Sequence, residues 1–146
     1  MRKILVIGSG KSASSLIKYF LDNSVNENLH ITIGDINIDN AKRLIGNHKN
    51  AQAINLDIFN ETSRVNAIKN ADIIVSMLPA RFHIEVAKDC IVYSKNMVTA
   101  SYVSPEMKAL DTDAKAKGLV FMNEIGVDPG IDHMSAMQVL DSIRAK

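Results

Sequence analysis

The chain has 146 residues, a length that suits one domain of about 150 residues and excludes two full domains. Hydrophobic residues make up 47% and charged residues 23%, so a buried core can form. Lys and Arg number 17 against 16 for Asp and Glu, a net charge of +1. That balance gives no electrostatic reason to expect nucleic acid or an anionic membrane as a partner, and we expect a small molecule instead.

Cysteine content and apolar run lengths predict a cytoplasmic protein. The single cysteine, Cys90, cannot form an internal disulfide, and residues 1–3 lead directly into a short apolar strand instead of a signal peptide. The longest apolar runs, such as 73–78, fall well short of the roughly 20 residues that span a bilayer. Cys90 lies in an apolar helical segment, where an inert buried thiol is expected. No metal site is expected.

Short apolar runs alternate with helical patterns along the chain, which is typical of βαβ units around a buried parallel sheet. The predicted fold is therefore α/β, a doubly wound parallel sheet with strand order 3-2-1-4-5-6. Six strands are predicted, at Ile4–Ile7, His30–Ile33, Ala51–Leu56, Ile73–Leu78, Met97–Ala100 and Leu119–Met122.

Helices are predicted between these strands from apolar stripes and capping residues. The apolar residues of 12–21 recur at helical spacing and would pack on one face of the sheet. Asp39 is predicted to cap a short helix that ends at Gly46. Ser104, followed by Pro and Glu, is predicted to cap a helix that ends at Gly118.

The last 20 residues follow a different pattern. A turn-rich segment, 123–130, precedes a final apolar helix from Ile131 onward. This helix either folds back on the sheet or is the first element of a second domain that this chain does not contain, and we favour the second interpretation. The expected division is a nucleotide-binding domain over 1–125 and a loop with a first helix, 126–146, leading into a substrate domain.

The segment after the first strand fits the dinucleotide fingerprint G-x-G-x-x-G/A. Gly8 permits the tight turn, Gly10 lets the backbone approach a pyrophosphate, and Ala13 lets helix and strand pack closely. A nucleoside-triphosphate P-loop is excluded, because it needs a glycine where Leu5 stands. The sequence therefore predicts a Rossmann dinucleotide-binding domain whose first cofactor-binding residues are Gly8, Ser9, Gly10, Lys11, Ser12 and Ala13.

Two acidic residues after the second and third strands are further candidates for cofactor binding. Asp35 follows Gly10 by 25 residues, close to the roughly 20-residue offset at which a carboxylate meets the adenosine ribose. A 2′-phosphate beside that carboxylate would be repelled, so we expect NAD in preference to NADP; Lys42 and Arg43 one helical turn away weaken the argument. Asp57 either accepts from the adenine amino group or is a solvated turn residue.

Ligands of an open parallel sheet lie outside the carboxyl ends of its strands. Leu78 and Pro79, at the end of the fourth strand, are predicted to line the nicotinamide half of the cleft. His83 follows in the first turn of a helix, where the helix dipole disfavours its cation, and a packing or surface role is expected ahead of catalysis. Arg81 either pairs with a substrate carboxylate or faces solvent.

Two longer motifs follow the fifth and sixth strands, Thr99-Ala100-Ser101-Tyr102-Val103-Ser104-Pro105 and Asn123-Glu124-Ile125-Gly126-Val127-Asp128-Pro129-Gly130-Ile131-Asp132-His133-Met134. Together with the glycine turn, they resemble the saccharopine dehydrogenase family, most closely its glutamate-forming branch. The resemblance spans the whole chain but reaches only the cofactor domain and the entry to the family's second domain.

The resemblance implies an enzyme that oxidises the secondary amine of saccharopine with a nicotinamide coenzyme, giving an imine that water splits. It also implies that Ser101, Tyr102 and Asp128 bind substrate, with Tyr102 and Asp128 assisting proton transfer at the reacting nitrogen. A structural alternative stays open, with Tyr102 a pocket wall and Asp128 a cap before the following proline. NADP-using members carry a basic residue after the second strand, where this chain has Asp35.

Two other functions stay open: a stand-alone NAD-binding regulatory module, and a polyamine-forming relative such as carboxynorspermidine dehydrogenase. The 146-residue chain is expected to bind cofactor without turnover, because the family's remaining substrate residues lie in its second domain. A homo-oligomer formed through that domain is a further expectation.

Overall fold

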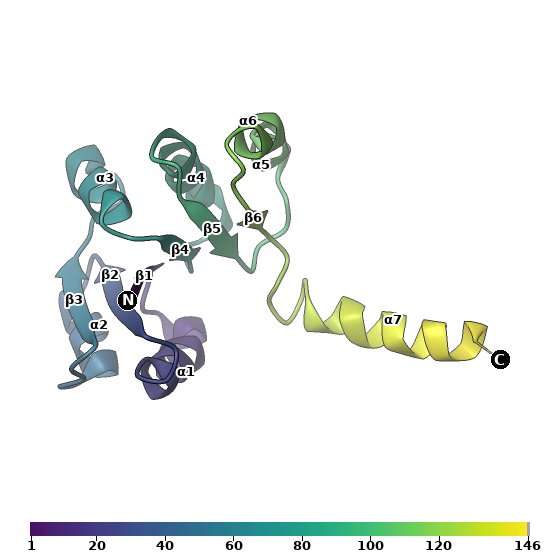
Figure 1. Cartoon of the computed structure of the whole chain (residues 1–146), viewed down its shortest axis with the longest axis horizontal. Coiled ribbons are helices and arrows are strands. Elements are labelled where there is room, and N and C mark those ends of the chain that lie inside the picture. The colour runs from purple at the N-terminus through teal and green to yellow at the C-terminus, as the bar shows by residue number, and fades with distance from the viewer. Residues whose placement is uncertain (146) are drawn as a thin grey trace.

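The computed structural model describes residues 1–145. Its centre is one six-stranded sheet in which every pair of neighbouring strands is parallel and the order is β3-β2-β1-β4-β5-β6 (Figure 1). The predicted fold class and strand order are confirmed. The strands are β1 (Arg2–Ile7), β2 (Leu29–Asp35), β3 (Ala51–Asn55), β4 (Ile73–Ser76), β5 (Asn96–Thr99) and β6 (Phe121–Met122).

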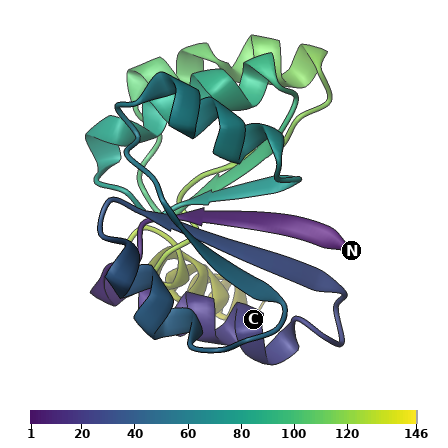
Figure 2. The same ribbon diagram turned by 90° about the vertical axis from the view of Figure 1, so that its left-hand side faces the viewer.

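Helices cover both faces of the sheet (Figure 2). Crossovers between parallel strands are right-handed, so the helices change face when strand order reverses beside β1. The first face carries the 3-10 turn η1 (Lys11–Ala13), α1 (Ser14–Asn23) and α2 (Ile38–Ile45). The second carries α3 (Glu61–Lys69), the 3-10 turn η2 (Ala80–Phe82), α4 (His83–Val92), α5 (Pro105–Ala109) and α6 (Asp111–Ala116).

Each face has its own hydrophobic core, because successive side chains of a strand point to opposite faces. In β1, Ile4 and Val6 belong to the core beneath α1 and α2, whereas Leu5 and Ile7 belong to the core beneath α3 and α4. All four are buried, and burying a side chain of this size stabilises the fold by about 1.5–3 kcal/mol. The continuous apolar run of β1 therefore fixes the sheet at the middle of the domain.

Of the two predicted helix caps, the one at Asp39 is wrong and the one at Ser104 is confirmed. Asn37, and not Asp39, caps α2: its side-chain oxygen accepts from the Asp39 amide at 3.1 Å, so Asp39 lies in the first turn. Ser104 caps its helix as predicted, accepting from the Met107 amide at 3.1 Å. That helix does not run unbroken toward Gly118; it divides into α5 and α6.

Two predicted strands are shorter in the structure. The prediction for the fourth ran to Leu78, but β4 ends at Ser76 because the glycine turn after Ile7 takes its pairing partner β1 away. The sixth keeps only Phe121–Met122 of its predicted four residues, because β5 pairs with it over only two positions. β4 is shortened at its carboxyl end, where the loops form the candidate site, whereas β6 is shortened at its amino end.

The last helix, α7 (Ile131–Arg144), projects away from the sheet and its flanking helices (Figure 1). None of its residues is buried. It therefore does not fold back on the sheet, which was one of the two expectations. Large apolar side chains stand exposed along it, at Ile131, Met134, Met137, Val139, Leu140 and Ile143. Over residues 1–145, no helix combines the length and the apolar character needed to cross a membrane.

Candidate functional site

The glycine turn between β1 and η1 is held tightly against the neighbouring strands. Gly8 has φ +101°, and a Cβ there would lie 2.9 Å from the carbonyl oxygen of Met77, so only glycine fits without strain. Gly10 differs, since no atom lies within 4 Å of the position of its Cβ. Ala13 is buried. The three small residues thus make a tight turn at Gly8, an open backbone at Gly10 and a buried contact at Ala13.

Beyond Gly10 the chain enters η1 and then α1, with Lys11 and Ser12 exposed in the first turn. The first amides of a helix have no acceptor within the helix, and the helix dipole adds positive potential there. The Ala13 amide is used internally, donating to the Gly10 carbonyl at 3.0 Å. The amide groups just before it, together with the open backbone at Gly10, form a cradle suited to a phosphate group.

Asp35, at the end of β2, reaches across to the turn. Its Oδ2 accepts from the Ser9 amide at 2.7 Å and from the Ser9 hydroxyl at 2.5 Å, and its Oδ1 accepts from the Asn37 amide at 2.8 Å. Burial opposes ionisation, but the hydrogen bonds from Ser9 and Asn37 outweigh it and hold the pKa of Asp35 below its ordinary value of 3.8. An ionised carboxylate therefore braces the glycine turn.

A mostly apolar cavity of about 170 Å³ opens beside this turn at the carboxyl edge. Five of the predicted cofactor residues line it together: Gly8, Asp35, Asp57, Leu78 and Pro79. An apolar cavity next to a phosphate cradle suits the flat ring and sugar of a dinucleotide. The residues present therefore fit a dinucleotide. Asp57 also closes its own turn, accepting from the Phe59 amide at 2.9 Å.

Two aromatic residues at this cavity were not singled out by sequence reasoning. Phe59 and Phe82 both line it and contact each other edge to face, with ring centroids 5.1 Å apart. Phe59 is 69% exposed. Arg81 stacks on the Phe82 ring at 4.5 Å. The signal available in sequence was weak, because each aromatic stands alone in a loop or short turn.

The two long motifs meet across the loops after β5 and β6. The Tyr102 hydroxyl donates to Asp128 Oδ1 at 2.7 Å. The hydrogen bond to Asp128 is the main cause that raises the pKa of Tyr102 above 10.0, with the nearby charges of Asp128, Asp132 and Glu124 adding to it. The phenol therefore stays protonated and acts as a donor at neutral pH.

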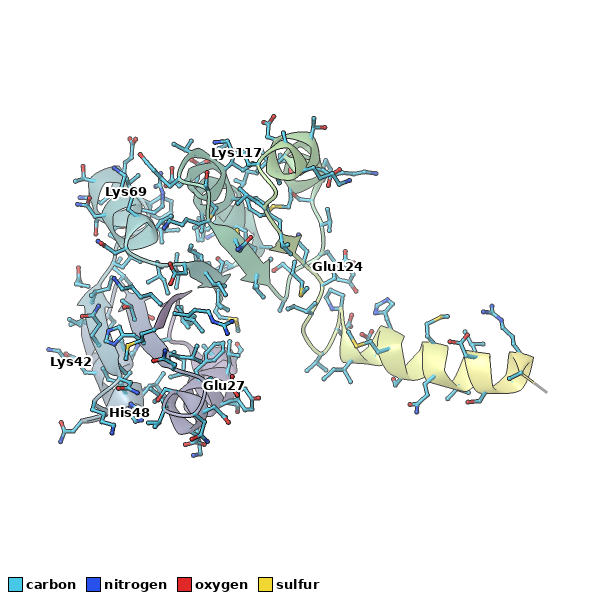
Figure 3. All side chains as sticks on the ribbon, in the orientation of Figure 1. Glu27, Lys42, His48, Lys69, Lys117 and Glu124 are labelled. Carbon is cyan, nitrogen blue, oxygen red and sulfur yellow. The ribbon has the colours of Figure 1, made fainter. Side chains whose placement is uncertain are left out.

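Glu124 fixes this pair in place. Its amide donates to the Ser101 carbonyl at 3.1 Å, and its carboxylate accepts from the Val103 amide at 3.0 Å. Figure 3 labels Glu124 where the chain leaves the sheet for α7. Gly126 and Gly130 then close a tight loop, in which the Ile131 amide donates to the Gly126 carbonyl at 3.0 Å. Asp128 lies on that loop, exposed beside Tyr102.

Ser101 forms a hydrogen bond with the buried side chain of His83, an interaction that was not predicted from the sequence. The Ser101 hydroxyl lies 2.8 Å from His83 Nε2, and the Ser76 hydroxyl lies 2.8 Å from His83 Nδ1. His83 is only 3% exposed, so its role includes packing, as the sequence favoured. Burial lowers the pKa of His83 below 6.5.

Comparison with known proteins identifies relatives of the whole chain. Residues 4–122 match the family model described as the saccharopine dehydrogenase NADP binding domain. The chain is 35% identical over 143 residues to a saccharopine dehydrogenase [NADP(+), L-glutamate-forming] of Schizosaccharomyces pombe, covering 98% of this chain and 31% of that protein. It is 33% identical over 144 residues to the mitochondrial alpha-aminoadipic semialdehyde synthase of Mus musculus, covering 98% and 15%.

Among solved structures, an apo saccharopine dehydrogenase (L-Glu forming) from Saccharomyces cerevisiae superposes with a TM-score of 0.88 at 30% identity. The match covers 99% of this chain and 32% of that one. A shikimate dehydrogenase of Mycobacterium tuberculosis shares the fold alone, with a TM-score of 0.60 at 20% identity over 83% of this chain and 45% of that one. The chain thus spans less than a third of the saccharopine dehydrogenases it matches.

The expected preference for NAD over NADP is wrong, because the matching family model and the named fungal relative are both NADP-binding. The expectation treated the two Asp35 oxygens as free to bind ribose hydroxyls. In the structure both oxygens accept hydrogen bonds from Ser9 and Asn37, so the carboxylate serves to brace the turn. Lys11 stands exposed in the turn that Asp35 braces.

The family model covers most of the chain, the relatives match it almost from end to end, and the glycine turn and the Tyr102–Asp128 pair occupy the carboxyl edge of the sheet. The chain belongs to the saccharopine dehydrogenase family and corresponds to its NADP-binding domain.

Proposed function

We propose that this chain is the nucleotide-binding part of an NADP-dependent oxidoreductase that acts on the CH–NH group of saccharopine or a similar secondary amine. One observation carries the proposal. The phosphate cradle at Gly10 and the hydrogen-bonded Tyr102–Asp128 pair lie on the same carboxyl edge of one parallel sheet. A coenzyme bound along that edge lies in the crevice between them.

The coenzyme is held by the turn and the cavity beside it. The backbone of 8–13 binds the pyrophosphate, Lys11 pairs with the 2′-phosphate, and the cavity that Asp57 and Pro79 line takes the adenosine or nicotinamide half. When bound, NADP supplies the hydride acceptor that the chain's own side chains cannot provide. Asp35 contributes by holding the turn in the shape that the phosphates need.

Substrate binding and proton transfer are assigned to the loops after β5 and β6. Ser101 binds the amino-acid end of the substrate. Asp128, exposed at the mouth of the site, takes the proton that the reacting amine releases. Tyr102 donates a hydrogen bond to the same carboxylate and so orients Asp128 to accept the proton of the amine. Because the pKa of Tyr102 is raised, its hydroxyl stays protonated and continues to donate this hydrogen bond.

The exposed apolar side chains of α7 are assigned to the contact with a substrate-binding domain. At least six large apolar side chains on this helix stand exposed, and the helix packs on neither face of the sheet. Exposed apolar surface of this extent marks a contact with another part of a protein. The saccharopine dehydrogenases matched are about three times as long as this chain, which leaves room for such a domain.

The test is an assay of saccharopine oxidation with NADP⁺ in the longest natural version of the protein, beside the 146-residue chain. We expect the short chain to bind NADPH without turnover and the longer protein to turn over. Tyr102→Phe in the longer protein should lower kcat and leave NADPH affinity unchanged, since Tyr102 lies outside the coenzyme cavity. A longer protein that binds NADPH but oxidises no secondary amine would overturn the proposed reaction.

A further inference from the structure

A buried hydrogen-bonded chain runs inward from the substrate-facing motif. Ser101 Oγ lies 2.8 Å from His83 Nε2, and on the other side of the ring His83 Nδ1 lies 2.8 Å from Ser76 Oγ. Thr99 Oγ1 is a second neighbour of Nε2, at 3.1 Å. Ser76, His83 and Thr99 are each at most 3% exposed. The register of β4 and β5 pairs Ser76 with Thr99, so the sheet itself sets the two hydroxyls beside the ring.

The position of the ring hydrogen follows from these neighbours. Burial lowers the pKa of His83, so the ring is neutral and carries one N–H. Nε2 faces two hydroxyl oxygens and Nδ1 faces one. One hydrogen can be shared between two oxygens in a three-centre bond, whereas one in-plane lone pair accepts only one hydroxyl well. Thr99 Oγ1 also acts as an acceptor for the Ser101 amide, at 3.4 Å. The hydrogen therefore belongs on Nε2, and Ser76 donates to Nδ1.

We propose that His83 is a positioning residue that presents the Ser101 hydroxyl to the substrate as a hydrogen-bond donor. Because Ser101 Oγ accepts from Nε2, its own hydrogen is free to point away from the ring. Its natural partner is an acceptor on the ligand, and in an amino-acid substrate that acceptor is a carboxylate oxygen. This assignment rests on the proposed function for the identity of the ligand, but the direction of the hydrogen bond does not.

The hydrogen-bond direction is tested without any ligand. The 146-residue chain is labelled with ¹⁵N in its four histidines, and the His83 signals are assigned by their loss in His83→Gln. We expect couplings that show a protonated Nε2 and an unprotonated Nδ1 through neutral pH. A hydrogen on Nδ1 would reverse the chain of hydrogen bonds and overturn the proposal, whatever the substrate is.

The positioning role is tested by two matched substitutions. The amide of His83→Gln reaches the place of Nε2 and can still contact Ser101, whereas the amide of His83→Asn reaches only the place of Nδ1 and Ser76. Saccharopine is titrated, with NADPH present, into the longest natural version of the protein carrying each substitution, and the shift of the Ser101 amide is followed by NMR. We expect His83→Asn to bind saccharopine about tenfold more weakly, as loss of one hydrogen bond to a charged group would produce, and His83→Gln to recover most of the affinity.

The outcomes separate this role from the proposed function. If the wild-type chain responds to saccharopine and His83→Asn responds equally, His83 has no positioning role. If the Ser101 amide of the longer wild-type protein does not respond although the Nε2–H form is found, the proposed substrate is wrong and Ser101 is not its carboxylate donor.

Discussion

Replacing Asp35 by Asn removes the charge that braces the glycine turn. The wild-type carboxylate accepts from the Ser9 amide and hydroxyl on Oδ2 and from the Asn37 amide on Oδ1. An asparagine keeps one oxygen and turns its NH₂ group toward one of these donors. The backbone amide of either Ser9 or Asn37 therefore loses its partner, and the domain should become less stable.

The expected loss follows from those hydrogen bonds. A hydrogen bond to a charged group contributes about 1.5–3 kcal/mol when buried, and solvent screening reduces that contribution at a half-exposed site such as Asp35. We expect Asp35→Asn to lower the free energy of unfolding by about 1–2 kcal/mol, which corresponds to a Tm about 3–8 °C lower, measured by circular dichroism at pH 7.

Asp57→Asn is the matched control. Its Oδ1 accepts from a single amide, that of Phe59, which an asparagine oxygen can replace, so its Tm should change by at most about 2 °C. The effect of Asp35 also depends on pH. Its folded pKa lies below the ordinary 3.8, so its contribution is complete above that value and is lost as pH falls through the lowered pKa. An Asp35→Asn variant as stable as wild type at pH 7 would refute the bracing role.

Three further predictions concern the turn, the substrate loops and the buried thiol. Gly8→Ala should lower the free energy of unfolding by about 1–3 kcal/mol, since φ at Gly8 is +101° and the new Cβ would lie close to the Met77 carbonyl oxygen. Gly10→Ala should leave the Tm unchanged and weaken NADPH binding, measured by calorimetry. The tyrosinate absorbance of Tyr102 should rise at lower pH in Asp128→Asn than in wild type; coincident titrations would exclude their hydrogen bond. Cys90, its pKa raised to about 12, should resist a thiol reagent until the chain is unfolded.

Local patterns were sufficient to predict the fold and the glycine turn. Each strand–helix unit is marked by its own apolar periodicity, and right-handed crossovers leave few ways to arrange the units. Gly8 could be assigned to the tight turn because that task depends on backbone conformation alone, and its φ of +101° agrees with it, whereas the approach of a pyrophosphate to Gly10 stays a prediction. The boundaries that failed, at the end of β4 and the start of β6, depend on how long a neighbouring strand continues to pair.

Long-range hydrogen bonds explain what sequence reasoning missed. Asp35 was interpreted as a free ribose ligand because its partner Ser9, 26 residues earlier, shows no pattern that predicts the contact. His83 was considered alone, although the register of β4 and β5 places hydroxyls on both sides of its ring. Tyr102 and Asp128 were assigned to one site only through the family resemblance, and the hydrogen bond that joins them is found only in the structure.

The most direct test of the account is an NMR titration of the ¹⁵N-labelled chain with NADPH and, separately, with NADH. We predict saturable shifts of the Gly10, Lys11 and Ser12 amides, shifts near Asp35, and tighter binding of NADPH than of NADH. Amides of the glycine turn that do not respond to NADPH, or a response confined to another part of the chain, would contradict it.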